Sequence, residues 1–79
     1  MIVVHTNVVV PLLVRTEQSA ASEQLYALGD EWYAPLLWRS ELTSALMAIA
    51  RRGLINPPQA RTALDESNLI IPPEHEVRS

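Results

Sequence analysis

The stretch MIVVHTNVVV (residues 1–10) sets three polar side chains directly after an aliphatic run. Residues 1–4 form a continuous apolar segment, which is typical of a parallel β-strand that is covered on both faces. In open parallel sheets, functional groups collect beyond the carboxyl ends of the strands. His5, Thr6 and Asn7 therefore lie where a site is expected, and Thr6 or Asn7 is also suited to cap a following helix.

The rest of the chain alternates helix-like and strand-like segments. Ala21, Leu25 and Leu28 share one face of segment 17–28, and Gly29 ends it. The expected elements are a strand over 1–4, a helix to 14, a helix over 17–28, a strand over 32–34, a helix from Pro35 to Arg52, a helix from Pro57 to about 67, and a strand over 69–71. This alternation predicts parallel βαβ units, and so an α/β fold with an incomplete parallel sheet of about three strands flanked by four helices. No element is expected in the tail.

The most strongly signalled element is the helix that Pro35 starts and Arg52-Gly53 ends. Its apolar stripe consists of Trp38, Leu42, Ala45, Leu46, Ile49 and Ala50. Glu41 lies on the border of this stripe, where a carboxylate is costly unless it is paired or binds a cation.

Composition limits the classes of protein that this chain can belong to. Its net charge is −3 and all six of its cations are Arg, which argues against a protein that holds nucleic acid mainly through a basic surface. The absence of Cys excludes disulfides and thiolate metal sites and fits a reducing compartment. The sequence has neither the pattern of a signal peptide nor a run long enough to cross a bilayer. We therefore expect a cytoplasmic protein with no membrane partner.

Several segments match a known family in their chain order. They are the opening MIVV-x-TNV, Pro11-Leu12-Leu13, Trp38-Arg39-Ser40-Glu41-Leu42 with Ala45-Leu46, Arg51-Arg52-Gly53-Leu54-Ile55, the helix after Pro57, and Leu69-Ile70-Ile71. Together they resemble the N-terminal part of a PIN domain, the fold of the VapC-type ribonuclease toxins of type II toxin–antitoxin pairs. The likeness covers essentially the whole chain and implies a single PIN-like domain over residues 1–79 that is truncated at its C-terminus.

The resemblance implies a metal-dependent endoribonuclease, in which carboxylates hold Mg²⁺ or Mn²⁺ for RNA phosphodiester hydrolysis. Glu41 matches the family's acidic position on the helix, and Asn7 matches a small polar neighbour of the site. His5 stands where the family has its leading Asp. The implied catalytic residues are thus His5, Asn7 and Glu41, with His5 and Glu41 at the metal. RNA and a cognate antitoxin protein are the implied partners.

Two departures from the family pattern predict impaired activity. His5 replaces an anionic oxygen ligand by a mostly neutral nitrogen ligand, which Mg²⁺ disfavours. The family's later acidic residues belong to a region that is expected to begin after Ser79. Two explanations would cover both departures. An active toxin kills its host, so surviving clones carry inactivating mutations; alternatively, the chain is a naturally degenerate PIN fragment.

Simpler readings of the same residues remain open. His5 is also compatible with a hydrogen-bonded core or edge residue, and Glu41 with a solvated helix position. His5 and His75 would need two further ligands to hold zinc, and the sequence offers no motif for them. Arg51 and Arg52 are most simply a charge pair at a helix C-terminus, with RNA contact as the alternative.

A second function, from another class, is a non-catalytic PIN-derived interaction module that binds an antitoxin or itself. If a later strand of the family's sheet is missing, residues 1–4 keep an open apolar edge, which is a template for pairing with another chain. We therefore expect a homodimer or a higher oligomer.

Overall fold

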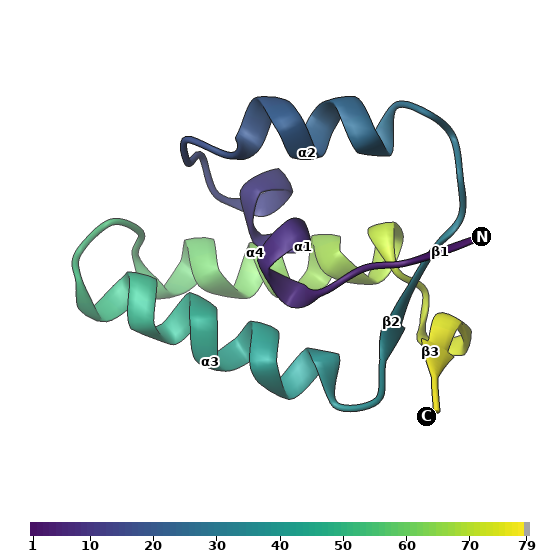
Figure 1. The fold of residues 1–79 in the computed structure, drawn as a ribbon. Coiled ribbons are helices and arrows are strands. Elements are labelled where there is room, and N and C mark those ends of the chain that lie inside the picture. Colours follow the sequence, from purple (N-terminus) through teal and green to yellow (C-terminus); the bar gives the residue numbers. More distant parts are fainter. Residues whose placement is uncertain (79) are drawn as a thin grey trace.

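The computed structural model describes residues 1–78, and its short sheet lies at one end of a set of helices (Figure 1). In chain order the elements are β1 (Ile2–Val3), α1 (Thr6–Leu13), α2 (Ser19–Tyr26), β2 (Trp32–Pro35), α3 (Trp38–Arg51), α4 (Pro57–Ile70), a 3₁₀ turn (Pro73–His75) and β3 (Glu76–Val77). The predicted α/β class, with a three-stranded parallel sheet and four α-helices, is confirmed. No helix within residues 1–78 combines the length and the apolar character needed to cross a membrane.

The sheet has the order β1-β2-β3, so β2 is central and both of its neighbours run parallel to it. The amino half of β2 pairs with β1, and the amide N–H of Val4 donates to the carbonyl of Tyr33 at 2.7 Å. The carboxyl half pairs with β3, and Leu36 N–H donates to the Val77 carbonyl at 2.9 Å. Each outer strand therefore uses a different half of β2.

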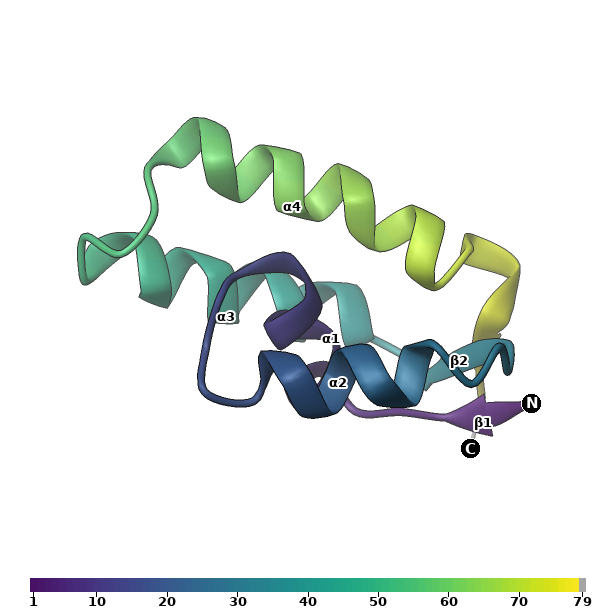
Figure 2. The same cartoon turned by 90° about the horizontal axis from the view of Figure 1, so that it is seen from above.

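The helices extend away from the sheet and pack around α1. Figure 2 shows α3 and α4 side by side and antiparallel, and α1 contacts both of them as well as α2. The core between these elements is formed by Val4, Val9, Trp32, Ala34, Trp38, Leu42, Leu46, Ala63 and Ile71. The side chain of Arg39 also links α3 to α4, because Nε and Nη2 donate to Asn68 Oδ1 at 3.0 and 2.6 Å.

Two helices follow their sequence signals closely. In α3 the predicted stripe is realised, since Trp38, Leu42 and Leu46 are fully buried. At the start of α4, Asn56 and Gln59 form a reciprocal capping box in which each side chain accepts from the backbone N–H of the other residue.

The predicted strand at 69–71 is wrong. Leu69 and Ile70 are the last residues of α4, and Leu69 is 80% exposed. The third strand is instead Glu76–Val77, in the tail for which no element was expected. The helical pattern of α4 continues to Ile70, and the prolines that follow stop it. Glu76 and Val77 have no strong strand preference as a pair, but pairing with the free half of β2 makes them a strand.

Helix boundaries also differ from the prediction. The helix expected from Pro35 begins at Trp38, because Pro35 is the last residue of β2. The helix expected over 17–28 is Ser19–Tyr26, and its inner face differs as well. Ser19 and Ser22 are buried there, whereas the expected core residues Ala21 and Leu28 are exposed.

The first strand is not covered on both faces as predicted. β1 lies at the edge of the sheet and Val3 is 51% exposed. The helix cap also differs from the prediction: His5 occupies the N-cap of α1, without a side-chain hydrogen bond, and Thr6 and Asn7 are the first helical residues. The helix therefore begins one residue earlier than a Thr6 cap requires and two earlier than an Asn7 cap requires.

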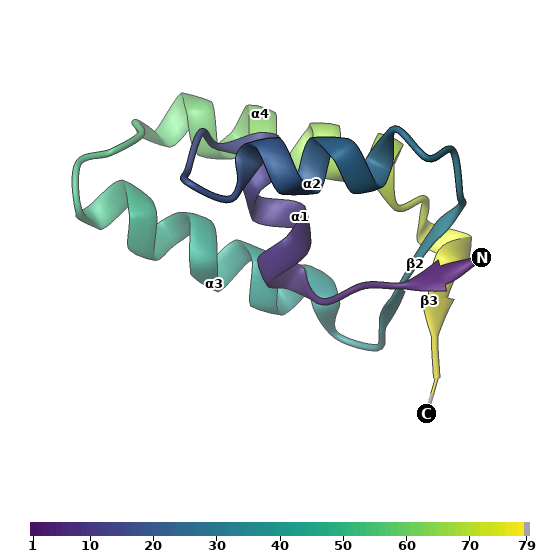
Figure 3. The same ribbon diagram turned by 45° about the horizontal axis from the view of Figure 1, so that its top comes forward.

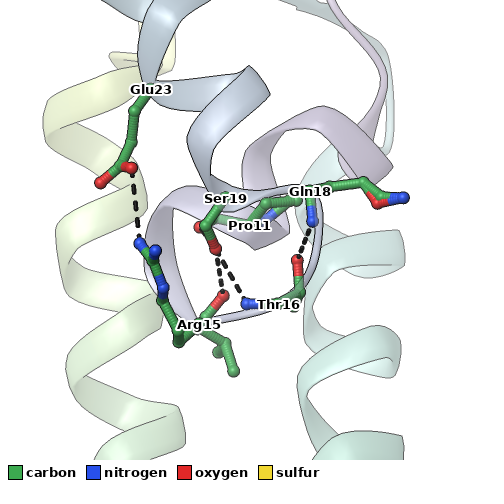
Figure 4. A network of polar contacts seen from close by, with 7 residues as sticks. Pro11, Arg15, Thr16, Gln18, Ser19 and Glu23 are labelled. Atoms are coloured by element: carbon green, nitrogen blue, oxygen red, sulfur yellow. Dashed lines mark hydrogen bonds and ion pairs between the residues drawn. The ribbon is translucent and has the colours of Figure 1, made fainter.

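A buried hydroxyl closes the joint between α1 and α2 (Figure 4). Ser19 Oγ donates to the Pro11 carbonyl at 2.7 Å and accepts from the Thr16 N–H at 2.8 Å. Thr16 Oγ1 in turn accepts from the Gln18 N–H at 3.1 Å. These bonds satisfy the Pro11 carbonyl, which the last turn of α1 leaves without a helical partner, and two N–H groups of the loop that leads into α2.

Candidate functional site

The predicted site residues meet in one hollow between the β1–α1 junction and α3. His5, Thr6 and Asn7 line it from the first turn of α1, and Glu41 and Ala45 line it from α3. We call it the His5–Glu41 hollow. A smaller adjoining hollow also contains His5 and Glu41, and its other wall is the turn between β2 and α3. The structure therefore brings together His5, Asn7 and Glu41, which are far apart in sequence.

Local structure explains how each residue reaches the hollow. His5 has extended backbone angles at the carboxyl end of β1, where a parallel sheet presents its functional groups. Glu41 lies in the first turn of α3, where the helix dipole stabilises a negative charge. Thr6 Oγ1 donates to the Trp38 carbonyl at 3.5 Å, which joins the starts of the two helices.

The backbone of α1 beside the hollow lacks one regular helical hydrogen bond. Pro11 lies inside α1 and has no N–H, so it cannot donate to the carbonyl of Asn7 four residues earlier. Both residues line the hollow. The Asn7 carbonyl is thus released from its usual helical partner.

Glu41 is exposed, so the cost of burial expected from the helix pattern does not arise. His5 and Asn7 are exposed as well. Within the described chain, Glu41 has neither an ion pair nor a side-chain hydrogen bond, and no Arg lines either hollow. The electrostatic character of the site is therefore set by a single solvated carboxylate.

These donors do not make a complete magnesium site. Mg²⁺ requires octahedral oxygen coordination, commonly one or two carboxylates with water and phosphate oxygens. The hollow offers one carboxylate, amide oxygen and an imidazole, and no group of three or more His, Asp or Glu side chains suited to a metal occurs in residues 1–78. Imidazole together with carboxylate suits later first-row divalent ions better than Mg²⁺.

His75 lies elsewhere and has structural partners. Its Nδ1 donates to the Trp32 carbonyl at 3.0 Å, and its Nε2 lies 3.5 Å from Glu31 Oε2. The ring stacks on Tyr33, with centroids 4.1 Å apart. His75 lines neither the His5–Glu41 hollow nor its neighbour, so it does not form a zinc pair with His5. Its contacts instead attach the 3₁₀ turn to β2.

Sequence reasoning missed two features of the site. Leu37, in the turn beside Glu41, adopts left-handed backbone angles with φ 73°, although nothing in its residue type indicates this. The turn also presents Leu36 and Leu37 to solvent at the rim of the smaller hollow. The Leu36-Leu37-Trp38 run signals burial, and only the path from β2 to α3 exposes its first two residues.

Comparisons with known proteins add no support to the resemblance to PIN domains, which depends on the matching residues alone. No protein-family model, no curated protein and no solved structure matches this chain.

Proposed function

We propose that this chain is a relative of the metal-dependent PIN-domain endoribonucleases in which the cation site, and with it RNA cleavage, is impaired. The observation that supports the proposal is the shared hollow of His5, Asn7 and Glu41. These are the residues that the family resemblance assigns to the site, and they come from two separate elements. The three-stranded parallel sheet with four helices is compatible with such a fold.

The proposed impairment follows from the donor set. Hydrolysis of this type uses divalent ions to generate a nucleophile and to stabilise charge at phosphorus. Replacing a carboxylate by His5 removes one anionic oxygen and leaves Glu41 as the carboxylate of the hollow. The hollow also lacks an Arg to hold a phosphate. His5, Asn7 and Glu41 would contact a bound ion, but by themselves they do not hold it tightly.

Restoring the carboxylate tests this proposal. In His5→Asp, millimolar Mg²⁺ or Mn²⁺ should raise the melting temperature more than in the unmodified chain, because the ion binds the folded state. For a domain of this size, each 1 kcal/mol of binding free energy raises Tm by about 4–8 °C. The double variant His5→Asp/Glu41→Gln should lose the response, while His75→Gln combined with His5→Asp should keep it.

Cleavage of a mixed-sequence RNA by the same variants supplies the functional readout. Activity that appears in His5→Asp and depends on both Glu41 and the ion supports an impaired nuclease. If Mg²⁺ and Mn²⁺ shift neither form, the cation site does not exist and the nuclease proposal fails.

A second candidate function, an interaction module that binds an antitoxin or a second copy, is supported by β1. The N–H groups of Ile2 and Val4 donate to the carbonyls of Glu31, just before β2, and of Tyr33 in β2, so the alternation of a strand turns the backbone groups of Val3 toward the open edge. Met1 and Val3 are 75% and 51% exposed there. An apolar edge of this kind accepts another strand.

A further inference from the structure

A second hollow lies at the end of the molecule away from the sheet. It forms where the loop after α1 meets the end of α3 and the start of α4, and Figures 1 and 3 show both connecting loops at this end. We call it the distal hollow. Its volume of ≈ 810 Å³ falls within the roughly 300–1,000 Å³ of small-molecule sites. It shares Thr16 with the His5–Glu41 hollow but none of that site's proposed functional residues.

Aliphatic side chains provide much of the distal hollow's lining. Leu13, Ile49 and Ile55 are half-buried, so each already packs partly against the protein. Leu54 also lines the hollow but is 65% exposed. A ligand with a hydrocarbon body would remove this surface from water, which favours binding in proportion to the area covered.

The charged residues of the distal hollow favour an anion. Arg15, Arg52 and Glu66 line it, which makes it locally positive on a chain whose net charge is −3. Arg15 Nη1 lies 3.5 Å from Glu23 Oε1, so part of its charge is already engaged. In the described chain, the Arg52 guanidinium has no ion pair and no hydrogen bond. The N–H donors of the Arg52 guanidinium are therefore available, and their planar arrangement matches the two oxygens of a carboxylate.

The start of α4 cannot provide the anion contact through its backbone. Pro57 and Pro58 have no N–H, the Gln59 N–H donates to Asn56 Oδ1 at 2.8 Å, and the Ala60 N–H donates to the Asn56 carbonyl at 3.0 Å. The donors of this helix end are thus absent or occupied. Recognition of an anion in the distal hollow must depend on the arginine side chains.

We propose that the distal hollow binds a small anionic amphiphile. Its carboxylate or similar head pairs with Arg52, and its aliphatic body packs on Leu54 and Ile55. A ligand with both parts satisfies the free guanidinium and covers the exposed leucine at the same time. This inference does not depend on the nuclease proposal, because the two hollows have no charged residue in common.

The full chain should be titrated with octanoate, octanol and octylammonium by NMR, with the melting temperature as a second readout. Octanoate should bind about tenfold more tightly than octanol, because the charge-assisted pair with Arg52 is added to the same apolar contact. Octylammonium should bind no more tightly than octanol. Glu41→Gln should leave octanoate binding unchanged.

The chain offers a matched control for the arginine. Arg51 lies in the last turn of α3, next to Arg52, but does not line the distal hollow. Arg52→Gln should weaken octanoate binding about tenfold, whereas Arg51→Gln should change it less than about twofold. Arg52→Lys, which keeps the charge but loses the planar guanidinium, should retain part of the affinity.

Two results would overturn the proposal. Equal affinity for octanoate and octanol in the unmodified chain would show that no cation takes part. Equal losses in Arg51→Gln and Arg52→Gln would assign the effect to general charge at the end of α3. The first comparison needs no variant and stands even if Arg52→Gln fails to fold.

Discussion

Leu37 joins β2 to α3 with a φ of 73°, in the left-handed region. A non-glycine residue there costs roughly 1–2 kcal/mol, and Leu37 regains little by burial because it is 64% exposed. Its carbonyl accepts from the Glu41 N–H at 3.2 Å. The strain is therefore located in the turn that fixes the first turn of α3, and with it the carboxylate of the candidate site.

Replacing Leu37 by Gly should raise the free energy of unfolding by about 0.5–1 kcal/mol, since Gly adopts a positive φ without strain but loses more entropy on folding. Denaturant unfolding measures this change. Leu36→Gly is the control, because Leu36 does not have a positive φ, and it should destabilise. If Leu37→Gly is as destabilising as Leu36→Gly, the left-handed turn does not store the strain inferred here.

At the scale of elements, the joint between α1 and α2 depends on one hydroxyl. Ser19 is 1% exposed and contacts the Pro11 carbonyl and the Thr16 N–H, which are both polar groups of the backbone (Figure 4). Thr16 lines the His5–Glu41 hollow and the distal hollow. The same bonds that end α1 therefore also shape the wall between the two candidate sites.

Ser19→Ala should lower the free energy of unfolding by about 1–3 kcal/mol, because it leaves the buried Pro11 carbonyl and the part-buried Thr16 N–H without their hydrogen-bond partner. Chemical denaturation of the variant measures the loss. Ser22→Ala provides a close comparison: Ser22 is 6% exposed on the same helix, and its hydroxyl makes no hydrogen bond to the rest of residues 1–78. A near-neutral Ser19→Ala would mean that the joint is stabilised by packing alone.

At the scale of the whole molecule, a small core leaves much apolar surface in water. A chain of this size buries only about 60–65% of the surface of its unfolded state. Met1, Val3, Leu28, Met47, Leu54 and Leu69 are each more than half exposed. Of this surface, the part at β1 combines apolar side chains with free backbone groups, so it is the part best suited to a second copy.

If the chain pairs through β1, light scattering at tens of micromolar should give a mass above that of the monomer. Val3→Lys should shift it to the monomer, since a charge on an edge strand opposes strand addition. Leu69→Lys places the same charge on a more exposed residue of α4, outside the sheet, and should leave the mass unchanged. A monomeric unmodified chain, or equal effects of both lysines, would contradict pairing at this edge.

Local signals predicted the apolar stripe and the C-terminal end of α3 and the start of α4 at Pro57, because side-chain periodicity and proline geometry act within one helix. The start of α3 was misplaced, because Pro35 belongs to β2. The class of the fold and the placement of His5 after β1 also followed from the pattern of strands and helices. The inner face of α2 was misjudged because Ser19 is buried through hydrogen bonds, which hydrophobic periodicity does not register.

By itself, the sequence determined the alternation of strands and helices, the start of α4 and the residues that gather at the end of β1. Their causes are local: backbone hydrogen bonding, side-chain periodicity and proline geometry. Only the tertiary structure decided that Glu76–Val77 is a strand and that Leu37 is left-handed. It also places Glu41 and His5 in one hollow, which the sequence suggested only through the family resemblance. Each of these depends on contacts between residues distant in sequence. Pairing with the free half of β2, or the turn from β2 into α3, outweighs the weak conformational preference of the residues involved.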